Sequence, residues 1–240
     1  MPKNSPHANE SAITTQKAKY FVKNWALQSL LTYINWWDMF LDYLYPSFIK
    51  DYVLKTWGYG SFLIRPKTGD VAVANKVFIS NEYRINRSKE KTVAIDIGAN
   101  IGAFSVAWLR RNPNGVIYSY EPEPQNFAQL NKNLKLNKVD KRAVAMDSVI
   151  LEDQIERHGL KTIDFLKIDY EGSEYEILYG LKKSTVDKIR KIIVEAHTLK
   201  SAPKTHTPDV LYRHLVARGF KVERKVFFEY AKTELFICER

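Results

Sequence analysis

Short, almost continuously apolar runs recur along the chain from residue 93 onward, and stretches with helical character separate them. Strands of this kind are buried on both faces of a parallel sheet, and right-handed helical crossovers connect them. The pattern predicts an α/β, doubly wound, mostly parallel Rossmann-like sheet. Strands are expected at 93–97, 116–120, 143–146, 163–168 and 189–194, and helices at 104–111, 124–136, 151–158, 173–181 and 208–218.

Two further strand-like runs close the chain, at residues 220–228 and 234–238, with only a short polar segment between them. No helical stretch separates these runs, so they are expected to form an antiparallel C-terminal hairpin at the edge of the parallel sheet.

The segment from about Lys17 to Trp57 is rich in aromatic residues and leucine at three- and four-residue spacing, which predicts helices. Pro46 is expected to end or kink one of them. Short β-type runs at 62–64, 71–73 and 77–79 then predict a strand or hairpin that enters the core. We therefore expect a tail and aromatic-rich helical extension over residues 1–60 and a main domain over residues 61–240.

The aromatic faces of this extension are expected to pack on the main domain, and the alternatives are a peripheral membrane contact or a lid over the substrate. Asn35, Asp38, Asp42 and Pro46 interrupt the most apolar stretch, so no transmembrane helix is predicted. Residues 1–16 lack the apolar run of a secretory signal peptide, and the single cysteine, Cys238, permits no internal disulfide. The expected location is the cytoplasm, with attachment to a membrane surface as the alternative.

The formal net charge is +10, with 37 basic and 27 acidic residues. Such a charge suits an anionic partner, such as nucleic acid, a phosphorylated substrate or an acidic membrane surface. The basic residues are scattered, however, and the alternative is that the charge only sets solubility. A hydrophobic content of 45% excludes a disordered chain.

The first predicted core strand runs into a glycine turn that contains Asp96, Gly98, Asn100 and Gly102. The two glycines allow a tight turn and the close approach of a ligand, while the carboxylate of Asp96 suits a cationic amino-acid ligand and would repel a pyrophosphate. Asn100 stands where the dinucleotide fingerprint requires glycine, which disfavours NAD.

Glu121 follows the second predicted strand, where an acidic side chain can accept hydrogen bonds from both hydroxyls of a ribose. Pro122 fixes the turn behind it, and Glu123 is expected to be a solvated acid at the start of the next helix. Asp147 and Ser148, at the tip of the third strand, are candidate adenine contacts, with a helix N-cap as the alternative.

Asp169 and Glu171 follow the fourth predicted strand, and His197 follows the fifth. The carboxyl ends of parallel strands share one edge of a sheet, so these groups are expected to face the same crevice as Asp96 and Glu121. His197 or Asp169 is expected to act as a base toward a hydroxyl, with Glu171 orienting; alternatively, Glu171 satisfies amides at the next helix start. These groups and Glu195 offer metal donors, but their spacing identifies no metal, and none is predicted.

Taken together, these segments resemble FkbM-type S-adenosylmethionine-dependent methyltransferases from about Phe62 to the C-terminus. The most specific element is the Lys-Ile-Asp-Tyr-Glu-Gly-Ser-Glu run at residues 167–174. The other matching segments are 63–70, 82–84, 95–102, 120–122 and 194–197. One departure concerns residues 137–151, where the chain is shorter than is usual in the family and leaves little room for additional strands.

The resemblance implies a class I methyltransferase fold, S-adenosylmethionine as cofactor and, usually, O-methylation of sugars, glycolipids or other secondary metabolites. It implies contacts to the cofactor from Asp96, Gly98, Gly102 and Glu121, and an acceptor close to Asp169, Glu171 and His197.

The sequence therefore predicts an S-adenosylmethionine-dependent methyltransferase that acts on a hydroxyl of a sugar, glycolipid or secondary metabolite. One alternative is a nucleic-acid methyltransferase, although the fourth strand lacks an Asn/Asp-Pro-Pro-aromatic run. Another is a non-catalytic domain that binds the cofactor or a partner. A dehydrogenase would require affinity for NAD.

Overall fold

The computed structural model describes residues 26–148, 151–198, 201, 203–227 and 233–240. The chain divides into two compact units, residues 1–84 and 85–240, which are described separately below. No helix within the described ranges is long and apolar enough to cross a membrane. The division expected at residue 60 falls between the two strands of a hairpin in the first unit.

The first unit, as far as it is described, combines helices with a two-stranded hairpin. Its elements are α2 (Ala26–Thr32), α3 (Trp36–Leu44), β1 (Tyr52–Lys55), β2 (Ser61–Ile64) and α4 (Asp70–Phe78). The strands pair antiparallel, with Tyr52 opposite Ile64. Its core is apolar and partly aromatic: Tyr33, Met39, Leu54, Phe62, Ile64, Ala74, Val77 and Phe78 are buried.

Two expectations for this unit are wrong. Residues 52–55 form a strand, although helices were expected as far as Trp57, because the chain beyond Pro46 pairs with residues 61–64. Residues 70–78 form a helix, although β-type runs were expected at 71–73 and 77–79. Ala74, Val77 and Phe78 are buried at helical spacing, and tertiary burial of this face outweighs the β propensity of the valines.

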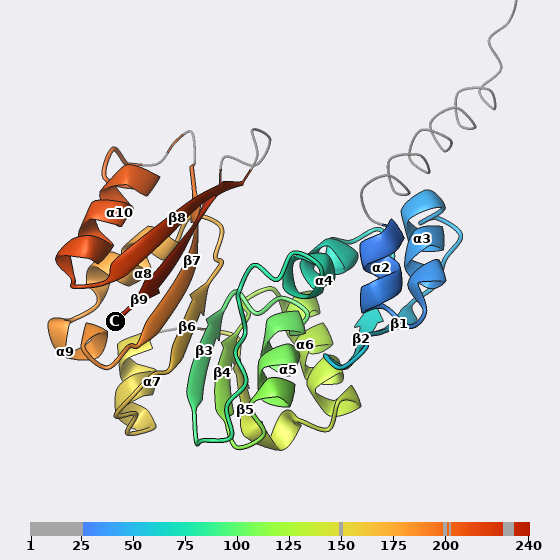
Figure 1. Cartoon of the computed structure of the whole chain (residues 1–240), viewed down its shortest axis with the longest axis horizontal. Coiled ribbons are helices and arrows are strands. Elements are labelled where there is room, and N and C mark those ends of the chain that lie inside the picture. Colours follow the sequence, from blue (N-terminus) through green and yellow to red (C-terminus); the bar gives the residue numbers. More distant parts are fainter. Residues whose placement is uncertain (1–25, 149–150, 199–200, 202, 228–232) are drawn as a thin grey trace, which may run out of the picture. The chain divides into compact units, whose positions relative to one another are not determined.

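The second unit contains a seven-stranded sheet in the order β5-β4-β3-β6-β7-β9-β8 (Figure 1). The first five strands in this order are parallel, and β9 pairs antiparallel with both β7 and β8. The predicted doubly wound sheet and its C-terminal antiparallel hairpin are therefore confirmed. The strands are β3 (Val93–Ile97), β4 (Val116–Tyr120), β5 (Ala143–Met146), β6 (Phe165–Ile168), β7 (Lys191–His197), β8 (Lys221–Phe227) and β9 (Thr233–Glu239).

Helices cover this sheet, with α5 and α6 in contact with each other beside β4 and β5. The helices are α5 (Ala103–Arg111), α6 (Pro124–Leu136), α7 (Leu151–Arg157), α8 (Glu174–Gly180), α9 (Lys183–Val186) and α10 (Pro208–Ala217). One core cluster joins side chains of α7, α8 and α10 to alternate strand positions, which include Ile95, Ile97, Leu166, Ile168 and Val194.

Alternation along the strands sends the intervening side chains to the opposite face. Asp96, Ser119, Lys167 and Glu195 lie there, all buried, and Ser105 of α5 contacts the first two of them. Buried polar residues on one face, close to the carboxyl ends of parallel strands, mark the position of the candidate site.

Candidate functional site

The glycine turn after β3 packs directly against the end of β6. Gly98 and Gly102 adopt φ values of 75° and 81°, a region that glycine enters without steric cost. A Cβ on Gly98 would lie 1.8 Å from the backbone oxygen of Asp169, and one on Gly102 would lie 2.6 Å from Cδ1 of Leu130. Gly98 is therefore required by close packing against backbone as well as by its conformation, whereas the positive φ is the stricter requirement at Gly102, where the contact is with the end of a leucine side chain.

Glu121 holds this turn through its carboxylate. One oxygen accepts a hydrogen bond from the amide of Asn100 at 2.7 Å, and the other accepts from the amide of Glu123 at 3.0 Å. Asn100 itself has a φ of 50°, in a region that asparagine tolerates better than most residues. A carboxylate has about four acceptor positions, so two remain for the ribose hydroxyls expected here.

Asp96 lies beneath the turn and is completely buried. Its carboxylate accepts a hydrogen bond from Oγ of Ser105 at 2.6 Å and forms an ion pair with Nζ of Lys167 at 3.0 Å. The Lys167 ammonium also donates to the backbone oxygen of Gly98 at 2.7 Å. This geometry makes Asp96 a positioning residue for the turn, and the ligand contact that the sequence suggested for it stays a prediction.

Burial by itself would lower the pKa of Lys167, but the carboxylates of Asp96, Asp169 and Glu195 outweigh it and raise the pKa. The lysine therefore remains a cation that joins β3, β6 and the glycine turn.

The tips of β4 and β5 carry the other residues that the sequence predicts to contact the cofactor. The amide of Glu121 donates to the backbone oxygen of Met146 at 3.0 Å. Asp147 and Ser148 directly follow Met146, so this bond holds the chain that carries them beside Glu121. Pro122, Asp147 and Ser148 are exposed, as a surface for ligand contacts requires. The alternative role of Asp147 or Ser148 as a helix N-cap involves residues 149–150, which lie outside the described residues.

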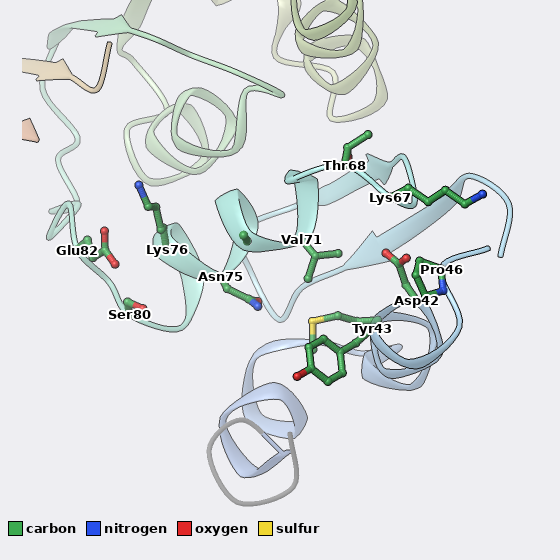
Figure 2. A pocket seen from close by; sticks show the side chains of 12 residues that line it. Asp42, Tyr43, Pro46, Lys67, Thr68, Val71, Asn75, Lys76, Ser80 and Glu82 are labelled. Atoms are coloured by element: carbon green, nitrogen blue, oxygen red, sulfur yellow. The ribbon is translucent and has the colours of Figure 1, made fainter. Parts of the chain in front are cut away.

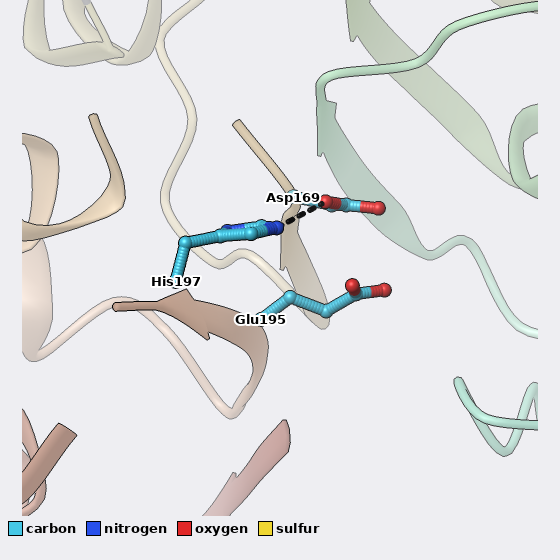
Figure 3. Close-up of side chains that lie close together, drawn as sticks. All are labelled: Asp169, Glu195 and His197. Carbon is cyan, nitrogen blue, oxygen red and sulfur yellow. Dashed lines mark ion pairs between the residues drawn. The ribbon is translucent and has the colours of Figure 1, made fainter. Parts of the chain in front are cut away.

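A second polar group of three residues lies at the carboxyl ends of β6 and β7 (Figure 3). Asp169, Glu195 and His197 each present a donor atom, and these atoms lie within 4.8 Å of one another. Nε2 of His197 is 3.8 Å from Oδ1 of Asp169. The side chains of His197 and Asp169 are 20% and 21% exposed, whereas Glu195 is buried, so the group opens to solvent on the side of Asp169 and His197.

Glu174, the first residue of α8, orients the imidazole of His197 and is fully buried. Its Oε1 accepts from the amide of His197 at 2.6 Å and lies 3.1 Å from Nδ1 of the ring. Its Oε2 accepts from the amide of Gly172 at 2.6 Å. Desolvation of the ring opposes the charged form of His197, but the hydrogen bond to Glu174 and the charges of Glu174, Asp169 and Glu195 raise its pKa.

Sequence reasoning missed the role of Glu174. One alternative for Glu171 was that it accepts a hydrogen bond from an amide at the start of the next helix. Glu174 makes such a bond instead, with the amide of Gly172, whereas Glu171 is exposed and has a φ of 47°. The available signal was an acid in the first turn of a helix that follows a glycine, a position that favours hydrogen bonds to free amides.

Within the described residues, the other histidines and the cysteine lie outside this group. His206 stacks on Tyr175 with ring centroids 5.1 Å apart, and His158 packs on Tyr118. Burial raises the pKa of the Cys238 thiol to about 12, so it is not a nucleophile at neutral pH.

Each unit also carries a pocket. Within the first unit, α3, α4 and the following loop line a space of about 640 Å³, with Met39, Asp42, Val71, Asn75 and Lys76 among its walls (Figure 2). A smaller pocket of about 430 Å³ in the second unit is basic, with Arg87, Lys89, Arg110 and Arg111 in its lining.

Two family models match the chain. The Methyltransferase FkbM domain covers residues 139–222, and the TRM5/TYW2 methyltransferase domain covers residues 72–166. Among curated proteins, methyltransferase sdnD of Sordaria araneosa is 23% identical over 51% of this chain and 73% of its own length. The 31-O-demethyl-FK506 methyltransferase FkbM of Streptomyces tacrolimicus is 23% identical over 46% of this chain and 67% of its own length.

Solved structures share the fold. TYW2 of M. jannaschii, determined in complex with AdoMet, has a TM-score of 0.50 at 18% identity and covers 80% of this chain and 87% of its own. These findings confirm the predicted resemblance to FkbM methyltransferases and the Rossmann-like methyltransferase fold.

Proposed function

We propose that this chain, an S-adenosylmethionine-dependent methyltransferase of the FkbM type, methylates a hydroxyl oxygen of a sugar, glycolipid or secondary metabolite. The observation that carries the proposal is the contact between Glu174 and His197, because it leaves one nitrogen of the ring directed at Asp169. The name of the S. tacrolimicus relative, which acts on an O-demethyl compound, agrees with an oxygen acceptor.

The tautomer of His197 follows from this contact. The carboxylate of Glu174 accepts only, so Nδ1 of the neutral ring carries the proton that faces it, and Nε2 keeps its lone pair. Nε2 lies on the partly exposed side of the group, where an acceptor hydroxyl can reach it. A histidine held in this way is suited to remove a proton from a hydroxyl.

When bound, S-adenosylmethionine supplies a methyl group on a positively charged sulfur. The chain's own residues then align the acceptor and take its proton: His197 or Asp169 receives the proton from the hydroxyl, and the exposed Glu171 orients the acceptor. The turn from Gly98 to Gly102 would hold the donor, with Glu121 available to the ribose and Asp147 and Ser148 available to the adenine. Because alignment supplies much of the rate in such a displacement, loss of the base reduces turnover without abolishing it.

The first test is calorimetric titration of the full chain with S-adenosylmethionine, S-adenosylhomocysteine and NAD. Binding of both adenosyl compounds without binding of NAD is expected. Acceptor panels of sugars, glycolipids and secondary metabolites are then incubated with methyl-labelled cofactor, and the products are analysed by NMR for an O-methyl group. His197→Ala and Asp169→Ala are expected to lower turnover with little change in cofactor affinity. A labelled product whose methyl group is on nitrogen or carbon would overturn the assignment to oxygen.

We also propose that the first unit contacts a membrane surface, which fits a glycolipid acceptor. Large apolar side chains are exposed on and near α2 and α3, and Leu27, Leu31 and Phe48 are 70%, 71% and 85% exposed. Such exposure on a small unit is typical of an interaction surface. Co-sedimentation with vesicles is expected for the wild type and reduced for Leu31→Ser/Phe48→Ser; equal sedimentation would exclude this surface.

A second candidate acceptor is nucleic acid, favoured by the net charge of +10 and by the basic pocket. Arg110 and Arg111 lie at the C-terminal end of α5, and this helix follows β3 and runs back along the sheet. They therefore lie toward the amino ends of the parallel strands, whereas Asp169 lies at the carboxyl ends. The pocket is therefore poorly placed to deliver an acceptor to the site. A steep loss of acceptor affinity with added salt would support nucleic acid, and a salt-independent affinity would exclude it.

A further inference from the structure

We infer that Asp169, Glu195 and His197 bind a divalent metal cation of the Mg²⁺ or Mn²⁺ class. This inference rests on the proposed function, because it specifies how the acceptor end of the same site handles a hydroxyl. It was not expected from the sequence, whose spacing identified no metal.

The donor set has the composition of a metal site. Two carboxylates and one imidazole are ligands that suit hard and borderline divalent ions, and Mn²⁺ accepts both types. The three residues come from two adjacent strands: Asp169 follows β6 directly, and Glu195 and His197 lie two positions apart near the end of β7. Regular backbone thus holds the donor atoms, as a preformed site requires.

The distances are compatible with one shared ion. Two ligands on opposite sides of Mg²⁺ are about 4.2 Å apart, and those around a larger ion such as Ca²⁺ are about 5 Å apart. Two neighbouring ligands of an octahedral Mg²⁺ are about 3 Å apart. The 3.8 Å between Nε2 of His197 and Oδ1 of Asp169 lies between the values for neighbouring and opposite ligands. The three donor atoms lie at most 4.8 Å from one another, and small rotations of the carboxylates would bring them closer to a shared ion.

Glu174 provides the observation that separates a metal site from a mere group of acids. Histidines that bind metals generally donate their second ring N–H to a carboxylate or carbonyl, which fixes the tautomer and the ring orientation. Glu174 is fully buried, lies 3.1 Å from Nδ1 of His197 and is held in place by the amides of Gly172 and His197. In the neutral ring the lone pair of Nε2 consequently faces the carboxylate of Asp169, and a cation between the two would be bound by both.

The charges nearby favour a cation as well. The carboxylates of Asp169 and Glu195 both attract the buried ammonium of Lys167. A divalent ion beside these two carboxylates would be attracted in the same way.

The inferred ion also restricts the class of acceptor. Three protein ligands leave about three positions of an octahedral ion open, and the group is accessible through Asp169 and His197. An acceptor with two adjacent oxygens, such as a vicinal diol, fills two of these positions and presents one oxygen for methylation. Coordination lowers the pKa of that hydroxyl, so its proton can pass to solvent water. With the ion bound, this route replaces the proton transfer to His197 or Asp169 proposed above, because both residues then act as ligands.

The test is titration of the full chain with Mn²⁺, followed by electron paramagnetic resonance, in the presence of S-adenosylhomocysteine. One saturable Mn²⁺ per chain is expected for the wild type. Asp169→Asn, which changes a partly exposed side chain and keeps its size, is expected to weaken Mn²⁺ binding at least about tenfold. Glu174→Gln should weaken it by roughly 10- to 100-fold without removing a ligand. Glu176→Gln removes an equivalent charge from the exposed face of α8 and should leave Mn²⁺ affinity unchanged.

Circular dichroism of each variant establishes that it is folded, and Asp169→Asn remains informative if the buried Glu174→Gln does not fold. Absence of saturable Mn²⁺ binding, or equal affinity in the wild type and Asp169→Asn, would overturn the metal site. Binding of S-adenosylhomocysteine in the same samples separates that result from failure of the proposed function. A chain that binds the nucleoside but no Mn²⁺ remains a methyltransferase that uses His197 as its base.

Discussion

The backbone oxygen of Asp169 occupies the space into which a side chain on Gly98 would project, 1.8 Å from the position of its Cβ. The turn proposed to hold the cofactor and the strand end proposed to face the acceptor are therefore in direct contact. A change at Gly98 must displace one of them.

Gly98→Ala is expected to lower both stability and affinity for S-adenosylhomocysteine. The φ of 75° alone costs about 1–2 kcal/mol for a residue with a Cβ, and the contact with Asp169 adds to it. Thermal melts and calorimetric titration should show a lower Tm and at least about tenfold weaker binding. Gly180→Ala is the matched control, because a Cβ there has no neighbour within 4 Å and the residue ends a helix. Equal effects of the two substitutions would contradict the packing argument.

Lys167→Met is expected to destabilise the second unit by about 3–5 kcal/mol, because it leaves the fully buried carboxylate of Asp96 without its ion-pair partner. Urea unfolding measures the change. Adding Asp96→Asn to the same chain should recover part of the loss, since it removes the uncompensated charge. Strictly additive losses in the double variant would show that the two residues do not interact.

Glu121→Gln tests the ribose side of the site. Glutamine has one acceptor oxygen, so its NH₂ group must face either the amide of Asn100 or the amide of Glu123. Affinity for S-adenosylhomocysteine should fall by roughly 10- to 100-fold, the equivalent of one or two lost hydrogen bonds to a charged group. The exposed neighbour Glu123→Gln is the control and should bind normally. Unchanged affinity in Glu121→Gln would remove Glu121 from the cofactor site.

His214 gives stability a predictable dependence on pH. Burial and then the positive charge of Arg218 lower the pKa of its imidazole below the usual value. The unfolded chain therefore binds the proton more readily, and stability falls as the pH drops through about 6.5 toward the lowered folded value.

Thermal melts between about pH 8 and pH 5.5 should show a smaller loss of Tm in His214→Gln than in the wild type. The variant also loses the edge contact between His214 and Tyr179, whose ring centroids are 4.8 Å apart, and this loss lowers Tm at every pH. The Tm of each protein is therefore compared with its own value at high pH. Parallel pH profiles for the two proteins would show that His214 does not contribute.

Much of the second unit could be predicted from local pattern. Continuous apolar runs are long enough to indicate buried parallel strands, and the expected ranges 93–97, 116–120 and 143–146 agree with β3, β4 and β5. In the first unit the runs are only three or four residues long. Residues 71–73 and 77–79 could belong to either a strand or a helix, and packing of Ala74, Val77 and Phe78 in the core favoured the helix.

The sequence by itself determined the fold class, the glycine turn and the edge of the sheet that carries the polar groups, because these depend on the local periodicity of apolar residues and on residues that directly follow strands. Only the tertiary structure decided which of these groups are partners. Asp96 meets Lys167 through the register of β3 with β6, and Glu174 meets His197 because α8 packs against β7. Such contacts join residues far apart in the chain, and their geometry depends on how whole elements pack, which no local pattern encodes.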